Sequence, residues 1–171
     1  APALQKALDY ATKHLPIPKV MTYQLADGET TVSFVRPVRH LTALFGADVV
    51  PVELFGLKAG RVTRGHRFHA PDPVEIPDAD SYCETLRSVR VEPCYDARRA
   101  RIEEELRSRA AALEATPIMP EDLLEEVSAL TEWPVIYESR FEEEFLRVPE
   151  ECLILTLQLN QKYFALRDKA G

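Results

Sequence analysis

The 171-residue sequence lacks any apolar run that approaches the roughly 20 residues of a membrane-spanning helix, so we expect no membrane partner. It also lacks the basic stretch followed by an apolar block that begins a secretion signal. Cysteine is scarce: the three thiols at positions 83, 94 and 152 form no CxxC pair and fit no zinc-ligand spacing. Free thiols in a reducing compartment are the simplest interpretation, which predicts a cytoplasmic protein in which Cys83 and Cys94 are buried.

Motifs of nucleotide and metal chemistry are missing too. The chain contains neither GxxxxGK[ST] nor GxGxxG, which excludes a phosphate-binding loop of either kind. His66 and His69 have an HxxH spacing without an obvious third ligand, so we expect surface or hydrogen-bonded histidines and no metal site. The clusters LLEEV (123–127) and FEEEF (141–145) are more typical of solvated helix faces than of paired catalytic carboxylates. No catalytic residue is predicted.

The charges that are present are segregated along the chain. The net charge is −7, and 46% of residues are hydrophobic, as in an ordinary globule. Between positions 36 and 67 the sequence contains six basic and two acidic residues, which gives this stretch a net charge of +4. Between positions 117 and 151 eleven acidic residues face two arginines, a net charge of −9. This distribution leaves room for a polyanionic partner that the overall charge would argue against.

Hydrophobic periodicity and turn residues predict helices over about 3–15, 80–88 and 95–114, one opening at Pro120, and one after Pro149. In the helix after Pro120, Leu123, Val127 and Leu130 are expected to form a buried stripe. Strands are predicted at 30–38 and 133–141, and a hairpin or sheet corner at Gly46–Asp48. Because no regular βαβ alternation occurs, the predicted fold class is α+β, a mixed sheet with packed helices. We expect one module over 1–171, with a basic β-rich part at about 17–70 and a helix-rich acidic part at about 78–160.

The stretch GLKAGRVTRGHRF, residues 56–68, holds five basic or imidazole side chains and three glycines; we call it the cationic strip. Its glycines and β-branched residues disfavour a helix, so an exposed loop or hairpin with guanidiniums on both sides is expected. Arginine forks match phosphate oxygens, and glycine permits close approach of a backbone to a ligand. Internal ion pairs with the acidic third of the chain are an equally open interpretation. The residues alone do not name a reaction.

Six ordered blocks across the chain resemble the β subunit of the bacterial heterotetrameric glycyl-tRNA synthetase. The blocks are LPIPKVM (15–21), FVRPV (34–38), VVPVELFGLKAGRVTRGHRF (49–68), LLEEVSALTEWPV (123–135), FEEEFLRVP (141–149) and QKYF (161–164). Arg39, His40 and Asn160 depart from the family's usual residues, so no role is carried over to them. The resemblance, together with the start at Ala1, predicts an excised internal module of a longer β chain.

The resemblance implies an ATP-dependent class II glycine–tRNA ligase in which ATP, with magnesium, is used by a separate catalytic α subunit. It implies no cofactor in this module, and tRNA(Gly), the α subunit and the remainder of the β chain as partners. At fold level it implies similarity to the editing-type module of the phenylalanyl-tRNA synthetase β chain, which alone assigns no activity.

Three functions follow as alternatives. In the first, the module is non-catalytic and contacts the tRNA backbone through Lys58, Arg61, Arg64, His66 and Arg67, with Arg36 and Arg39 as further candidate contacts. The second is an editing hydrolase of mischarged tRNA, which glycine needs less than larger amino acids because no competitor is smaller. The third is a structural spacer whose arginines are used in internal ion pairs.

Overall fold

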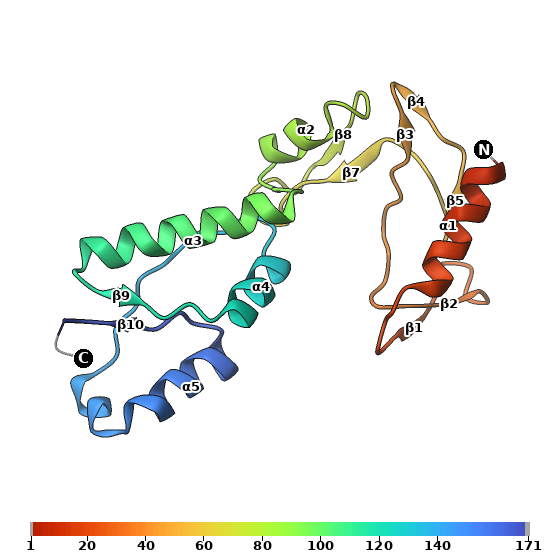
Figure 1. Cartoon of the computed structure of the whole chain (residues 1–171). Helices are drawn as coiled ribbons and strands as arrows, with labels where there is room; N and C mark the ends of the chain where they lie inside the picture. The colour runs from red at the N-terminus through yellow and green to blue at the C-terminus, as the bar shows by residue number, and fades with distance from the viewer. Residues whose placement is uncertain (1, 170–171) are drawn as a thin grey trace. The chain divides into compact units, whose positions relative to one another are not determined.

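The computed structural model describes residues 2–169, and the chain divides into two compact units, Ala1–Val89 and Arg90–Gly171 (Figure 1). In unit 1 the elements are α1 (Pro2–His14), β1 (Met21–Gln24), β2 (Thr31–Phe34), β3 (Leu44–Phe45), β4 (Asp48–Val49), β5 (Glu53–Leu54), β6 (Leu57–Lys58), β7 (Val62–Arg64), β8 (Pro73–Glu75) and α2 (Tyr82–Ser88). In unit 2 they are α3 (Tyr95–Ala112), β9 (Thr116–Pro117), α4 (Glu121–Leu130), the 3₁₀ helix η1 (Glu143–Arg147), α5 (Glu150–Gln161) and β10 (Leu166–Arg167). Across residues 2–169, no helix is both long and apolar enough to cross a membrane.

The chain contains both helices and strands, as predicted, but the prediction of one mixed sheet is wrong. Every named strand pairs in a two-stranded antiparallel sheet: β1–β2, β3–β4, β5–β6, β7–β8 and β9–β10. The only parallel pairing in the described part of the chain is the isolated bridge between Thr42 and Gly60. The reason is strand length, because runs of two to four residues between turns leave little edge for a further strand.

The hairpins of unit 1 follow turn chemistry. Gly46, with φ of 58°, stands in the β3–β4 turn, so the hairpin expected at this point is confirmed. A second hairpin, β5–β6, turns at Phe55 and Gly56, whose φ values of 54° and 75° are both left-handed. Two left-handed residues give the type I′ turn, which matches strand twist. Phe55 adopts the left-handed conformation although it is not glycine. Its ring packs on that of Phe34, with 4.5 Å between the ring centroids.

Unit 1 is held by few buried side chains. Val32, Val52, Ile76 and Leu86 come from four separated parts of the unit and are buried. The amide of Gln5 in α1 pairs with the backbone of Glu53, accepting from its N–H and donating to its carbonyl oxygen, both at 2.8 Å. This side chain satisfies backbone groups of β5 in the way a neighbouring strand would.

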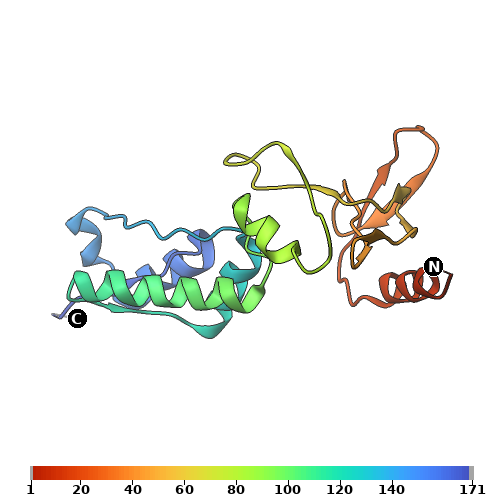
Figure 2. The same ribbon diagram turned by 90° about the horizontal axis from the view of Figure 1, so that it is seen from above.

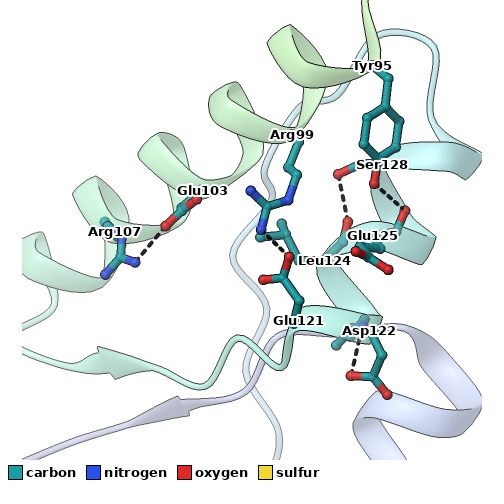
Figure 3. Close-up of polar contacts among 10 residues, drawn as sticks. Tyr95, Arg99, Glu103, Arg107, Glu121, Asp122, Leu124, Glu125 and Ser128 are labelled. Atoms are coloured by element: carbon teal, nitrogen blue, oxygen red, sulfur yellow. Dashed lines mark hydrogen bonds and ion pairs between the residues drawn. The ribbon is translucent and has the colours of Figure 1, made fainter.

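Unit 2 is centred on α3 and α4. Ile102 and Leu106 of α3 and Leu124 of α4 form its buried cluster. The stripe expected on α4 is partly wrong: Leu123 is buried, but Leu130 is 69% exposed. Leu130 lies on the same face of the helix as Leu123, but it is the last residue of α4 and stands where the helix ends. The fully buried Ser128 instead completes the inner face, its hydroxyl donating to the carbonyl oxygen of Leu124 at 2.6 Å (Figure 3).

An ion pair and a hydrogen bond also join α3 and α4. Arg99 of α3 pairs with Glu121 of α4 at 2.5 Å, and the Tyr95 hydroxyl donates to the carbonyl oxygen of Glu125 at 3.5 Å (Figure 3). Within α3, Arg107 pairs with Glu103 one turn earlier at 2.6 Å. Many carboxylates of unit 2 therefore have cationic partners inside the unit.

The strand expected at 133–141 does not form. The segment has no ladder partner among the described residues and runs as coil past α3, with Ile136 packed against the buried cluster (Figures 1 and 2). Buried Pro134 removes one donor from the segment, which disfavours pairing. Trp133 is placed by cations instead, with the guanidiniums of Arg101 and Arg90 lying 4.8 and 5.4 Å from its ring centroid.

Candidate nucleic-acid interface

The cationic strip lies wholly in unit 1 and includes β6, β7 and the start of the loop that follows (Figure 1). β7 pairs with β8 in an antiparallel hairpin that matches Val62 with Glu75 and Arg64 with Pro73. The loop 65–72 joins the two strands. The expected loop or hairpin is thus confirmed, and its basic side chains fall into two groups with different surroundings.

Arg61 is used by the fold. Its Nη1 donates to the carbonyl oxygen of Pro77 at 2.9 Å, and its Nη2 donates to that of Ala47 at 2.7 Å. Its Nε lies 3.8 Å from a carboxylate oxygen of Glu75, and the side chain is 30% exposed. The fork therefore joins the β3–β4 turn to the segment after β8 and leaves few donors for a ligand.

Compared with Arg61, the side chains of Lys58 and the exposed arginines have weaker interactions within the fold, or none among the described residues. Lys58 lies 3.8 Å from Glu53, and the lysine side chain is 85% exposed, so this surface pair contributes little. Within residues 2–169 no carboxylate lies within 4.0 Å of the guanidinium of Arg36 or Arg64. Both arginines are exposed, Arg64 at the end of β7 and Arg36 just after β2. These cations are available to an outside anion.

His66 organises the turn that follows β7. Its Nδ1 accepts hydrogen bonds from the backbone N–H groups of Phe68 and His69, both at 3.2 Å. The Ala70 N–H closes the turn on the His66 carbonyl oxygen at 2.9 Å. Because Nδ1 accepts, the ring proton of the neutral histidine lies on Nε2. His66 is therefore a structural brace of the turn, with Nε2–H left as a donor.

The glycine at position 65 is explained by packing inside unit 1 and needs no bound ligand to account for it. A Cβ built at Gly65 would lie 2.5 Å from the Cβ of Val89 and 2.7 Å from its carbonyl oxygen. That carbonyl accepts from the His66 N–H at 2.9 Å. The glycine lets the start of the loop lie against the chain just after α2, which fixes the base of the turn.

The turn carries one aromatic ring that the charge pattern did not single out. Phe68 is 80% exposed, and the guanidinium of Arg67 lies 5.7 Å from its ring centroid. The signal was present in the sequence, since Phe68 closes the GHRF run, but its exposure depends on the turn. Arg67, also exposed, has no carboxylate within 4.0 Å in the described part of the chain.

A second polar site in unit 1 is a hollow of about 460 Å3 lined by His40, Thr42, Leu44, Thr63, Ala79 and Tyr82. It holds hydroxyls and one imidazole but no carboxylate. Residues 2–169 bring together no group of three or more histidine, cysteine or acidic side chains able to hold a metal ion.

All three cysteines are exposed, so the expected burial of Cys83 and Cys94 is wrong. Both stand where a helix begins, Cys83 in the first turn of α2 and Cys94 as the N-cap of α3.

Comparison with known proteins covers the whole chain. Residues 1–171 match the family described as glycyl-tRNA synthetase beta subunit. The chain is 57% identical to the glycine–tRNA ligase beta subunit of Leptothrix cholodnii, over 100% of this chain and 24% of that protein. It is 54% identical to the corresponding subunit of Thiobacillus denitrificans, over 98% of this chain and 24% of that protein. It is 52% identical to the subunit of Methylobacillus flagellatus, over 100% of this chain and 24% of that protein.

These matches define an aminoacyl-tRNA synthetase polypeptide. More narrowly, the chain belongs to the family of glycyl-tRNA synthetase beta subunits. It spans about a quarter of the length of the curated relatives that it matches.

Proposed function

We propose that this chain is a non-catalytic module of glycine–tRNA ligase that helps to bind tRNA(Gly) and to assemble the enzyme. The observation that carries the proposal is the division of the cationic strip. Arg61 is held by backbone carbonyls, whereas Arg64 and Arg67 are exposed and have no carboxylate within 4.0 Å among the described residues. Unpaired guanidiniums in an acidic chain are suited to a polyanion, because arginine binds phosphate oxygens bidentately.

The other parts of the proposal rest on membership of the glycyl-tRNA synthetase beta subunit family. Glycine activation with ATP and magnesium, by a class II active site, belongs to a separate α subunit in this proposal, and the location is the cytoplasm. The exposed thiols suit a reducing compartment. The exposed apolar side chains of α5, Leu155 and Leu159, support a role in assembly with the α subunit or the rest of the β chain.

Two other functions remain testable beside it. The spacer alternative is favoured by Arg61, which acts inside the fold. An editing hydrolase would have a fold like that of the phenylalanyl-tRNA synthetase editing module and would use the hollow lined by His40 and Tyr82. Hydrolysis of mischarged tRNA(Gly) that disappears in His40→Ala would support editing over the non-catalytic proposal.

The test is binding of a tRNA(Gly) transcript to the 171-residue chain by fluorescence anisotropy over a salt series. In the double variant Arg64→Ala/Arg67→Ala we expect weaker binding and a slope of log affinity against log salt reduced by roughly 0.7–0.9 per arginine. The melting temperature should stay nearly unchanged, because within residues 2–169 neither guanidinium has a carboxylate within 4.0 Å and the Arg67 contact with Phe68 is exposed.

The matched control is Arg140→Ala, which removes one exposed arginine from the acidic segment of unit 2. It should leave both the affinity and the salt slope as they are. No binding at low salt, or a double variant that melts early yet binds normally, would contradict tRNA contact and support the spacer.

A further inference from the structure

Phe68 is a solvent-exposed aromatic residue on the turn of the cationic strip. Phosphate binding by the arginines does not explain it. Phe68 is 80% exposed, so its side chain adds little to the burial that stabilises unit 1. Single exposed apolar residues are common on protein surfaces and by themselves indicate nothing. Two further observations set this one apart.

The first is that the turn holding Phe68 is braced before any ligand arrives. The Phe68 N–H donates to His66 Nδ1 at 3.2 Å, and the His69 N–H donates to the same atom. At the base of the turn, Gly65 lies against Val89, and the His66 N–H is bonded to the Val89 carbonyl oxygen. A ring presented on a preorganised backbone loses less entropy when a partner binds.

The second observation is the charge around the ring. The guanidinium of Arg67 lies 5.7 Å from the ring centroid, and Arg64 ends the strand that leads into the turn. Proteins that bind single-stranded nucleic acid combine cations for the backbone with aromatic rings on which bases stack. The cationic surroundings of the ring suit a polyanionic partner.

We infer that Phe68 stacks on an unpaired nucleobase while Arg64 and Arg67 bind the adjoining phosphates. The inference rests on the proposed tRNA binding and adds to it the kind of RNA that is recognised. Stacking needs a base released from its helix, since bases inside an RNA duplex do not offer their faces. The strip therefore selects a single-stranded part of the RNA rather than a helical stem.

The experiment compares a single-stranded RNA oligonucleotide carrying one 2-aminopurine with a blunt RNA duplex of the same length. We expect the 171-residue chain to bind the single strand more tightly and to change its 2-aminopurine fluorescence. Phe68→Ala should weaken single-strand binding by about 5- to 100-fold. It should leave the salt slope unchanged, because no charge is removed. Phe68→Trp should restore both binding and the fluorescence change.

Phe45 supplies a matched control. It is 81% exposed on the β3–β4 hairpin and has no cation over its ring in the described part of the chain. Phe45→Ala should bind like the unaltered chain. Equal binding of duplex and single strand, or an unaffected Phe68→Ala variant, would overturn the inference.

The two proposals can fail separately. If Arg64→Ala/Arg67→Ala lowers the salt slope while Phe68→Ala has no effect, tRNA binding stands and base stacking is wrong. If neither variant changes binding, both are wrong.

Discussion

Arg61 Nη2 donates a 2.7 Å hydrogen bond to the carbonyl oxygen of Ala47, fourteen residues earlier in the chain. With the bond from Nη1 to Pro77, the guanidinium joins two loops that have no strand pairing with each other. A side chain in the middle of a cationic run is therefore a structural clamp, while Arg64, three residues later, remains available for binding.

The first prediction concerns that difference. Arg61→Ala should lower the free energy of unfolding by about 1–3 kcal/mol, because two carbonyl oxygens lose a charged donor. Amide hydrogen exchange around Ala47 and Pro77 should become faster. Arg64→Ala, which breaks no side-chain hydrogen bond or ion pair within residues 2–169, should stay within about 0.5 kcal/mol of the unaltered chain. Equal stability of the two variants would show that the clamp contributes nothing.

The second prediction separates two glycines of the strip. Gly65→Ala should destabilise the chain by about 1–3 kcal/mol in urea denaturation, because the new Cβ would meet Val89 at 2.5 Å. Gly60→Ala is the control, since a Cβ there meets nothing within 4 Å. That variant should be neutral, or more stable by up to about 1 kcal/mol because its unfolded chain is less flexible. A tolerated Gly65→Ala would mean that the loop can move away from Val89.

The third prediction concerns pH and the β1–β2 turn. The Thr30 hydroxyl, followed by the backbone N–H groups of Thr30 and Glu29, donates to Asp27 and lowers the pKa of its carboxyl. Because the folded-state pKa lies below the unfolded value of about 3.9, the carboxylate stabilises the turn above that pH. The contribution is lost as pH falls through the lower, folded-state pKa.

An NMR titration of the Asp27 carboxyl carbon should show this low pKa, and Thr30→Val should raise it toward the usual value. A midpoint for Asp27 that Thr30→Val leaves unmoved would mean that the hydroxyl contact is absent in solution.

Local patterns predicted the helices well. The periodic stretch from Tyr95 and the segments after Pro120 and Pro149 all form helices that begin where expected. Such elements depend on residues a few positions apart, which a sequence displays directly. Strands need a partner from elsewhere, and the described residues offer none at 133–141, so a β-rich composition did not suffice.

The candidate interface shows the same limit. Spacing identified the cationic strip and its hairpin, but Arg61, Arg64 and Arg67 are equivalent in sequence, three residues apart. Their different surroundings arise because Ala47 and Pro77 lie beside Arg61 in space, whereas no carboxylate of residues 2–169 lies within 4.0 Å of the other two guanidiniums. The brace by His66 and the exposure of Phe68 depend likewise on the folded turn.

The sequence by itself determined the segregation of charge, the helices, the glycine turns and, through its ordered blocks, the family. These properties reside in residue types and short spacings. Only the tertiary structure decided which arginine serves the fold, which are free to bind, and which aromatic ring faces solvent. Hydrogen bonds and burial depend on groups that come together from distant positions, and a linear chain does not show those neighbours.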